Sequence, residues 1–147
     1  MDNKTVVESV RDFILTCPHL EQLAKVDINF LDNKSINYSI ETTPSQNGGI
    51  VNEYLDGSKE MEFLFVFACM FDYSEDLQQQ IENCGFFEMF EEWILECNDN
   101  DVLPMLSNGK KSTSIECTTS GYTFLVSPTM DKARCQIQLK LIYEKEK

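Results

Sequence analysis

Few side chains in this sequence belong to the types that catalyse reactions or bind metals. The one histidine, His19, follows Pro18, and the six cysteines stand at positions 17, 69, 84, 97, 117 and 135. A histidine acts as a general base only beside a suitable partner, and one histidine with scattered cysteines cannot supply the usual zinc ligands. We therefore expect His19 to be a surface or turn residue. We predict no enzyme, no catalytic residue, no metal and no cofactor.

The cysteines are not arranged as C-x-x-C pairs, and most occupy apolar positions of a periodic pattern. A reduced cysteine at such a position behaves as a small hydrophobic residue. The first residues carry charges where a secretory signal is apolar. We therefore expect synthesis in the cytosol, where thiols stay reduced.

One group of acidic side chains could bind a partner. Glu88, Glu91, Glu92 and Glu96 recur at spacings of three and four, which places them on one face of a predicted helix. Such a stripe could dock a basic partner or hold a cation. It could equally be the solvated side of a helix whose opposite side is apolar.

Basic side chains concentrate at two places in this acidic chain. Lys110 and Lys111 follow Gly109 in a predicted loop, and Lys132, Arg134 and Lys140 cluster near the predicted closing strand. They could contact an acidic surface of a neighbouring copy. They could also be ordinary charged residues that flank strands.

Length and composition predict one folded domain over residues 1–147. The chain is 42% apolar and has a net charge of −13, which allows a substantial core but repels phosphate over most of the surface. We therefore expect no sequence-specific nucleic acid binding. No run of 18 apolar residues is present, so we expect no membrane-spanning helix.

Hydrophobic periodicity predicts two main helices. Thr5 to Glu8 fits a capping box, and apolar residues then recur at helical spacing to Cys17, where Pro18 ends the run. A second helix is expected from about Glu75 to Cys97. In that helix the period assigns Phe87, Phe90 and Ile94 to the core. It leaves Phe86, Met89 and Trp93 on a flank, which could be core or a subunit interface.

Alternating apolar residues predict strands through the rest of the chain. A hairpin turn at 32–35 is expected to join strands at 26–30 and 36–40, and Asp56-Gly57 to join strands at 50–55 and 61–71. Further strands are expected at 114–118, 122–126 and 133–143. The prediction is an α+β domain: a mostly antiparallel (mixed) β-sheet packed against two main α-helices, with a protruding β-hairpin.

Two strands have informative faces. Residues 61–71 are apolar on both faces, which predicts a central strand and a surplus of apolar surface typical of an oligomer. On the strand at 133–143 the odd-numbered residues are apolar and predict the core face. The other face is expected to meet solvent and carries Arg134, Gln136, Gln138 and Lys140.

The order of these motifs resembles a known family. A hairpin Tyr54-Leu55-Asp56-Gly57-Ser58, an aromatic strand and the segment from Gly85 to Ile94 come first. Leu103-Pro104-x-Leu106 with Gly109-Lys110, then Ser114-Ile115-Glu116, Gly121-Tyr122 and residues 136–143, follow in the same order. This series, over roughly residues 50–143, is similar to the small "minor capsid proteins" of phages of Gram-positive hosts, which resemble tail terminator proteins.

The resemblance implies a tail-terminator-like fold and a structural role in a virion or tail-like particle. Terminators form a hexameric ring that caps the tail tube, stops its polymerisation and offers its other side to the head connector. The implied partners are further copies of the chain, the tail tube protein, a sheath where the tail is contractile, and the connector. Related rings cap phage-tail-like bacteriocins, and assembly is expected in the bacterial host cytoplasm.

Alternative functions are a head-completion protein, which joins connectors, and a small-molecule binder that uses the aromatic helix as a pocket. For assembly, we single out three candidate surfaces and one aromatic residue. They are the hairpin tip (Asp56, Gly57, Ser58), the lysine pair (Lys110, Lys111), the polar strand face (Arg134, Gln136, Gln138, Lys140) and Trp93.

Overall fold

Two long strands form the middle of the structure, a computed structural model that describes residues 4–20, 26–29, 37–72, 77–126 and 132–147. Strand β4 (Lys59–Asp72) and strand β7 (Lys132–Lys145) pair antiparallel along their whole length. Strand β7 alternates between buried and more exposed residues over most of its length, whereas β4 has five consecutive buried residues, 65–69. Because a sheet with one covered face fixes the register of its strands, this ladder is strongly specified.

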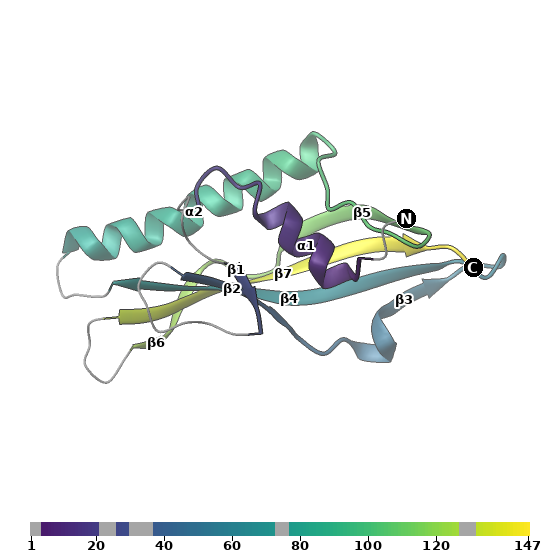
Figure 1. Ribbon diagram of the computed structural model, residues 1–147, viewed down its shortest axis with the longest axis horizontal. Helices are drawn as coiled ribbons and strands as arrows, with labels where there is room; N and C mark the ends of the chain where they lie inside the picture. The colour runs from purple at the N-terminus through teal and green to yellow at the C-terminus, as the bar shows by residue number, and fades with distance from the viewer. Residues whose placement is uncertain (1–3, 21–25, 30–36, 73–76, 127–131) are drawn as a thin grey trace.

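The seven described strands form one mixed sheet with the order β1-β2-β4-β7-β5. Strand β3 extends the β2 side of β4, and β6 extends the β5 side of β7. The remaining strands are β1 (Val26–Ile28), β2 (Asn37–Thr42), β3 (Ile50–Glu53), β5 (Lys110–Cys117) and β6 (Tyr122–Val126), and a short 3₁₀ turn, η1 (Gln46–Gly49), precedes β3. The α+β prediction is confirmed, and the β3–β4 hairpin projects at one end of the molecule (Figure 1).

The hairpin predicted between the first two strands is wrong. Strand β1 pairs with β2 in parallel, with Val26 opposite Tyr38 and Ile28 opposite Ile40. Asn29 ends β1 early, because its backbone is left-handed at φ 55° and its side chain accepts a hydrogen bond from the Thr42 backbone N–H at 3.0 Å. The predicted turn at 32–35, with Phe30 and Ile36, lies outside the described residues.

Both predicted helices are present. Helix α1 (Val6–Ile14) begins with the expected capping box: the Thr5 hydroxyl accepts from the Glu8 backbone N–H at 3.3 Å, and the Glu8 carboxylate accepts from the Thr5 backbone N–H. Helix α2 (Leu77–Asp99) continues through Gly85 without interruption. Its predicted start at Glu75 falls outside the described residues.

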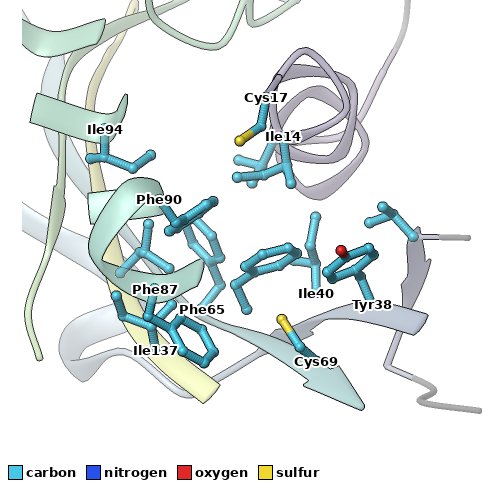
Figure 2. Close-up of a cluster of buried hydrophobic side chains, with 14 of the residues drawn as sticks. Ile14, Cys17, Tyr38, Ile40, Phe65, Cys69, Phe87, Phe90, Ile94 and Ile137 are labelled. Atoms are coloured by element: carbon cyan, nitrogen blue, oxygen red, sulfur yellow. The ribbon is translucent and has the colours of Figure 1, made fainter. Parts of the chain in front are cut away.

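The two helices cover the same face of the sheet (Figure 1), which we call the helix face; the opposite one is the open face. Figure 2 shows Ile14 and Cys17 at α1 and Phe87, Phe90 and Ile94 on α2 pointing toward one another above the strands. From below, the core receives the odd-numbered residues of β4 and β7 and the even-numbered residues of β2. The predicted core face of β7 is therefore confirmed, and β4 is a central strand, as predicted.

Helix α2 buries more aromatic surface than its period predicts. Phe86, expected on a flank, is only 9% exposed; its ring stacks on Tyr38 at 5.8 Å and meets Phe71 edge-on at 5.2 Å. The sheet beneath α2 is wide enough to receive Phe86 and Phe87 side by side. Met89 does lie on an exposed flank.

The described cysteines behave as apolar residues. Cys17, Cys69, Cys97 and Cys135 are buried, Cys117 is half-buried, and no disulfide joins these five. Burial is the main reason that the pKa of Cys69 is raised well above its ordinary value. The side chain of Cys84 lies outside the described set.

Candidate assembly surfaces

The hairpin tip, residues 54–58 between β3 and β4, contains four hydrogen bonds. The Tyr54 backbone N–H donates to the Ser58 carbonyl at 2.8 Å, and the Gly57 N–H donates to the Tyr54 carbonyl at 3.0 Å. The Asp56 carboxylate accepts from the Ser58 N–H at 2.8 Å and from its hydroxyl at 2.6 Å. These bonds to Ser58 lower the pKa of Asp56. They hold the turn in one shape while Leu55 projects fully exposed into solvent.

The C-terminal residues brace this tip. The Glu146 backbone N–H donates to the Gly109 carbonyl at 2.9 Å, which ties the tail to the turn before β5. The Lys147 side chain lies so close to Gly57 that a Cβ there would come within 2.8 Å of Lys147 Cδ. Gly57 has a φ of 91°, which glycine adopts without strain. The hairpin tip, the start of β5 and the described end of the chain therefore meet at one end of the molecule (Figure 1).

Lys110 and Lys111 are the first residues of β5 and do not lie in the predicted loop. The strand begins four residues before the predicted start because Lys110 and Lys111 pair with Lys145 and Glu144 of β7. Lys145 also lies opposite Lys59 of β4. Three lysines thus stand side by side across three strands, and we call Lys59, Lys145 and Lys110 the lysine row.

The lysine row is unfavourable by itself, because like charges directly opposite one another on a sheet repel. Carboxylates at this end offset part of the charge, with Glu53 opposite Lys59 and with Glu60 and Glu144 on the other face. The tip end of the molecule also carries Lys111 and Lys147. Asp56 and Glu146 lie there too, so five lysines and five carboxylates make this end close to neutral within a chain of net charge −13.

The polar side chains of β7 share the open face, as predicted. They form ion pairs and hydrogen bonds with other residues of the same subunit. Arg134 pairs with Glu41 at 2.5 Å and lies over the Phe124 ring at 5.3 Å from its centre. Lys140 pairs with Glu116 at 3.2 Å. Gln138 is the exposed member of this set.

Gln136 does not meet solvent, which corrects the prediction of a wholly solvent-facing strand side. Its side chain is buried, and its amide donates to the Tyr122 hydroxyl at 2.7 Å. The Gln138 amide donates to the same hydroxyl at 3.1 Å. Tyr122 lies opposite Gln136 on β6 and covers it, so any contact that this face makes with a partner would involve Gln138, Tyr122 and Phe124 more than Gln136.

Trp93 packs within the subunit on one side. Its ring stacks on Phe13 of α1 with centres 4.9 Å apart, and it contacts Phe90 at 5.8 Å. The residue is only half-buried. It therefore joins the two helices and leaves an edge at the surface.

A groove that the sequence did not reveal runs between α2 and the kinked edge formed by residues 116–123. It consists of two adjoining hollows, of about 170 and 440 Å³, which share Glu91 and Ser120. Phe87, Ile94, Cys117 and Cys135 form its apolar lining, and Glu88, Glu91 and Glu116 supply carboxylates. Burial and then the charges of Glu91 and Glu116 raise the pKa of Cys117 to about 12.

The groove arises because two different strands, β5 and then β6, pair with the same edge of β7. Strand β5 pairs with the β7 residues from Leu139 to Lys145, and β6 pairs with those from Ala133 to Gln136. Residues 118–121 connect the two strands and pass under α2, where Gly121 meets the Phe87 ring. The sequence predicts a break between strands at 114–118 and 122–126, but it does not predict that the connection passes under α2.

The structure brings the hairpin tip and the lysine pair together, and separates both from the polar β7 face and from Trp93. His19 is exposed in a turn, as predicted. Among the described residues no group of three or more His, Cys, Asp or Glu side chains could hold a metal ion. No described helix is both long and apolar enough to cross a membrane.

No model of a protein family matches this sequence, and no curated protein is detectably similar to it.

Proposed function

We propose that this protein is a tail terminator subunit, a non-enzymatic component of a phage tail or tail-like particle. In this role it forms a ring, caps the tail tube, stops its polymerisation and provides the surface that meets the head connector or collar. The ordered motifs between about residues 50 and 143 support the assignment through the resemblance described above. The α+β architecture with a projecting hairpin is compatible with it.

The observation that carries the proposal is the convergence of two predicted assembly elements at one end of the sheet. Ser58 of the hairpin tip and Lys110 are 52 positions apart in the sequence, yet β4 and β5 bring them to the same end of the sheet, with β7 between them. Leu55, at the summit of a turn fixed by Asp56 and Ser58, is fully exposed. A rigid projection with an apolar tip is suited to protein–protein contact.

The aromatic segment from Gly85 to Ile94 supports a structural role for the same motif series. Phe86, Phe87, Phe90 and Ile94 are buried in the core. They are therefore used for packing α2 on the sheet, and a structural protein requires nothing more of them.

The test is to delete the gene for this chain from the genome that encodes the phage or tail-like particle, and to measure tail lengths by electron microscopy. A terminator is required for length control, so we expect tails of uncontrolled length, restored to uniform length by the wild-type gene. Tails of normal length joined to heads would contradict the proposal. Normal tails that accumulate apart from filled heads would instead indicate a head-completion protein.

One structural observation favours the alternative of a small-molecule binder: the hollow of about 170 Å³ beside Phe87 and Tyr122. Aromatic walls with a few polar groups are typical of ligand pockets. A screen of small cationic and aromatic compounds by NMR chemical shifts would show saturable shifts at 87–91 and 120–123 if this alternative holds. Their absence, together with uncontrolled tails in the deletion, would leave the terminator.

A further inference from the structure

The two faces of the sheet carry opposite charges at the tip end of the molecule. Odd-numbered residues of β4 and β7 lie on the helix face, so Lys59 and Lys145 lie there, and Lys110 is directly opposite Lys145. Glu60 and Glu144 are directly opposite each other on the open face, and we call them the carboxylate pair. Each face of this end therefore presents charges of one sign in direct register.

The lysine row and the carboxylate pair are not neutralised by each other or by an ion pair within the subunit. The described ion pairs, Lys4–Asp12, Arg134–Glu41 and Lys140–Glu116, all lie elsewhere. Like charges directly opposite one another on a sheet are destabilising. Both sets therefore gain from contact with a group of opposite charge.

One neighbour offsets part of the charge on each face. Glu53 lies opposite Lys59, and Lys111 lies opposite Glu144. Three lysines against one glutamate leave the helix-face side of this end positive, and two glutamates against one lysine leave the open-face side negative. Partial desolvation, and then the charges of the carboxylate pair, raise the pKa of Tyr54, in agreement with a negative potential on that side.

The two sets cannot meet within one molecule. Lys59 and Glu60 are consecutive residues of β4, and consecutive strand residues point to opposite faces of a sheet. Both sets nevertheless reach solvent, because Lys145 and Glu144 are exposed, whereas Tyr143, two residues before Lys145 on the helix face, is buried. Only a second molecule can place a lysine row against a carboxylate pair.

A second copy of this chain is the partner that these charges fit. The five lysines and five carboxylates of the tip end cancel, so the net charge of −13 lies on the rest of the chain. A basic partner would be attracted to that acidic remainder and not to the tip end in particular. Two copies repel each other through most of their surfaces, and their tip ends are where they can approach with the least repulsion. Each copy brings both a lysine row and a carboxylate pair to that end.

We propose that copies of this chain stack through their tip ends, with the lysine row of one copy against the carboxylate pair of the next. Tyr54 and Leu55, exposed on the hairpin tip, add apolar contact area at the same end. The contact joins the helix-face side of one copy to the open-face side of another, so it is head to tail. Such contacts close into a ring or continue as a filament. The inference gives the proposed terminator ring its subunit contact and rests on that function for its biological use.

Zero-length cross-linking tests the contact directly. Isotope-labelled and unlabelled protein are mixed and treated with a carbodiimide, which condenses a lysine amine with a touching carboxylate to an amide, with loss of water. We expect mixed-label links between the lysine row and the carboxylate pair. Lys111 and Glu144, opposite each other in one molecule, provide the same-label control link. Links from the lysine row only to glutamates of α2, or no links between molecules while the control link forms, would overturn the proposal.

Charge reversal tests which surfaces meet. The variants Lys59→Glu/Lys145→Glu and Glu60→Lys/Glu144→Lys are each expected to weaken self-association on the order of tenfold or more by sedimentation velocity. Mixed in equal amounts, the two variants should associate again, because each then meets opposite charge on both of its faces. A mixture that stays dissociated where the wild type associates would contradict the head-to-tail contact.

A matched variant separates this contact from general charge repulsion. Glu60→Lys/Glu144→Lys makes the chain less acidic, so general repulsion alone predicts stronger association, whereas the proposal predicts weaker association. Glu88→Lys/Glu92→Lys, on the exposed side of α2, changes the net charge equally and is the control. Circular dichroism establishes that all variants fold. Equal effects of these two double substitutions would overturn the proposal.

The two proposals fail in different experiments. If tails lacking the protein have normal length, the terminator function is wrong, and the cross-link still reports whether copies join row to pair. If the protein controls tail length and Glu60→Lys/Glu144→Lys does so as well as the wild type, the function stands and this contact is wrong.

Discussion

Gly121 has room for a hydrogen atom on its α-carbon and for nothing larger. A Cβ added there would lie 2.2 Å from Phe87 Cγ and 2.5 Å from Phe87 Cβ. The helix backbone fixes Phe87 Cβ, so a change of the Phe87 rotamer would not remove the 2.5 Å contact. The connection between β5 and β6 can therefore pass beneath α2 only because this residue has no side chain.

We predict that Gly121→Ala destabilises the protein by about 1–3 kcal/mol, the usual cost of forcing extra atoms into a packed core. Denaturant unfolding would measure the change in the free energy of unfolding. Gly85→Ala is the control, because nothing lies within 4 Å of a Cβ at that position. As an alanine inside a helix it should stabilise the protein by up to about 1 kcal/mol. Equal effects from the two substitutions would contradict the close contact with Phe87.

Individual residues also show where sequence reasoning stops. Alternation along β7 correctly placed Gln136 on the face opposite the core, because the period of a strand is two. It could not reveal that Tyr122, 14 positions earlier, covers that side chain. The helical period predicts Phe86 on a flank, because it gives only the direction in which a side chain points. Whether that side chain is buried depends on how far the sheet extends beneath the helix.

At the scale of elements, strand β5 depends on a side chain from α2. The side-chain amide of Asn98 forms two hydrogen bonds with one residue of β5. Its Oδ1 accepts from the Ile115 N–H at 2.9 Å, and its Nδ2 donates to the Ile115 carbonyl. The Ser112 hydroxyl also donates to the Pro104 carbonyl at 2.5 Å. Helix α2 and the connection after it therefore occupy part of the edge of β5, which limits pairing with other chains there.

We predict that Asn98→Ala lowers the free energy of unfolding by about 1–3 kcal/mol, because it leaves two partly buried backbone groups without their partner. Amide hydrogen exchange at Ile115 should become faster. Asp99→Ala, on the exposed side of the same turn, is the control. Removing an acidic group from a helix C-terminus should be neutral or slightly stabilising. Unchanged exchange at Ile115 in Asn98→Ala would show that the amide does not protect this edge.

Most elements were predictable because their signals are local. The capping box at Thr5, the Asp56-Gly57 turn, the continuous apolar run of β4 and the alternation of β7 each follow from a few neighbouring residues. The parallel pairing of β1 and β2 is a tertiary feature, and the turn-like residues between them suggested a hairpin instead. The early start of β5 was missed because Lys110 and Lys111 pair through their backbones and carry no apolar pattern.

The candidate site was predictable in its parts and not in its arrangement. The hairpin tip and the lysine pair were identified from residue type and turn chemistry, yet nothing local shows that β7 joins them through Lys145. The groove was missed altogether. Its walls come from α2 and from residues 116–123, and its depth depends on where β5 gives way to β6.

At the scale of the whole molecule, several buried cysteine thiols and one tyrosine hydroxyl make the stability of the fold depend on pH above neutrality. Burial raises the pKa of Cys17, Cys69, Cys97 and Tyr143, and raises that of Cys117 from 9.0 to about 12. The folded state therefore retains protons that the unfolded chain loses. Stability from these groups is fully present below the unfolded pKa and is lost as pH rises through the folded values.

We predict that the free energy of unfolding falls as pH rises from about 8.5 to about 10. Chemical denaturation at several pH values in this range would measure it. Cys117→Ala removes one contributing thiol and should make the decline shallower. Leu15→Asp, which leaves every thiol in place, should retain the wild-type slope. A wild-type stability that is constant over this range would show that the thiols titrate alike in both states.

The ladder between β4 and β7 also determines when the protein can acquire its fold. Strand β4 ends at Asp72 and β7 begins at Lys132, so α2, β5 and β6 are all synthesised between the two partners. Until β7 is synthesised, the edge of β4 that pairs with β7 has no partner strand. Pairing between strands so far apart in the sequence forms slowly. A nascent chain therefore exposes a long apolar strand for the time needed to make those 59 residues, which makes it a natural client for a chaperone during translation.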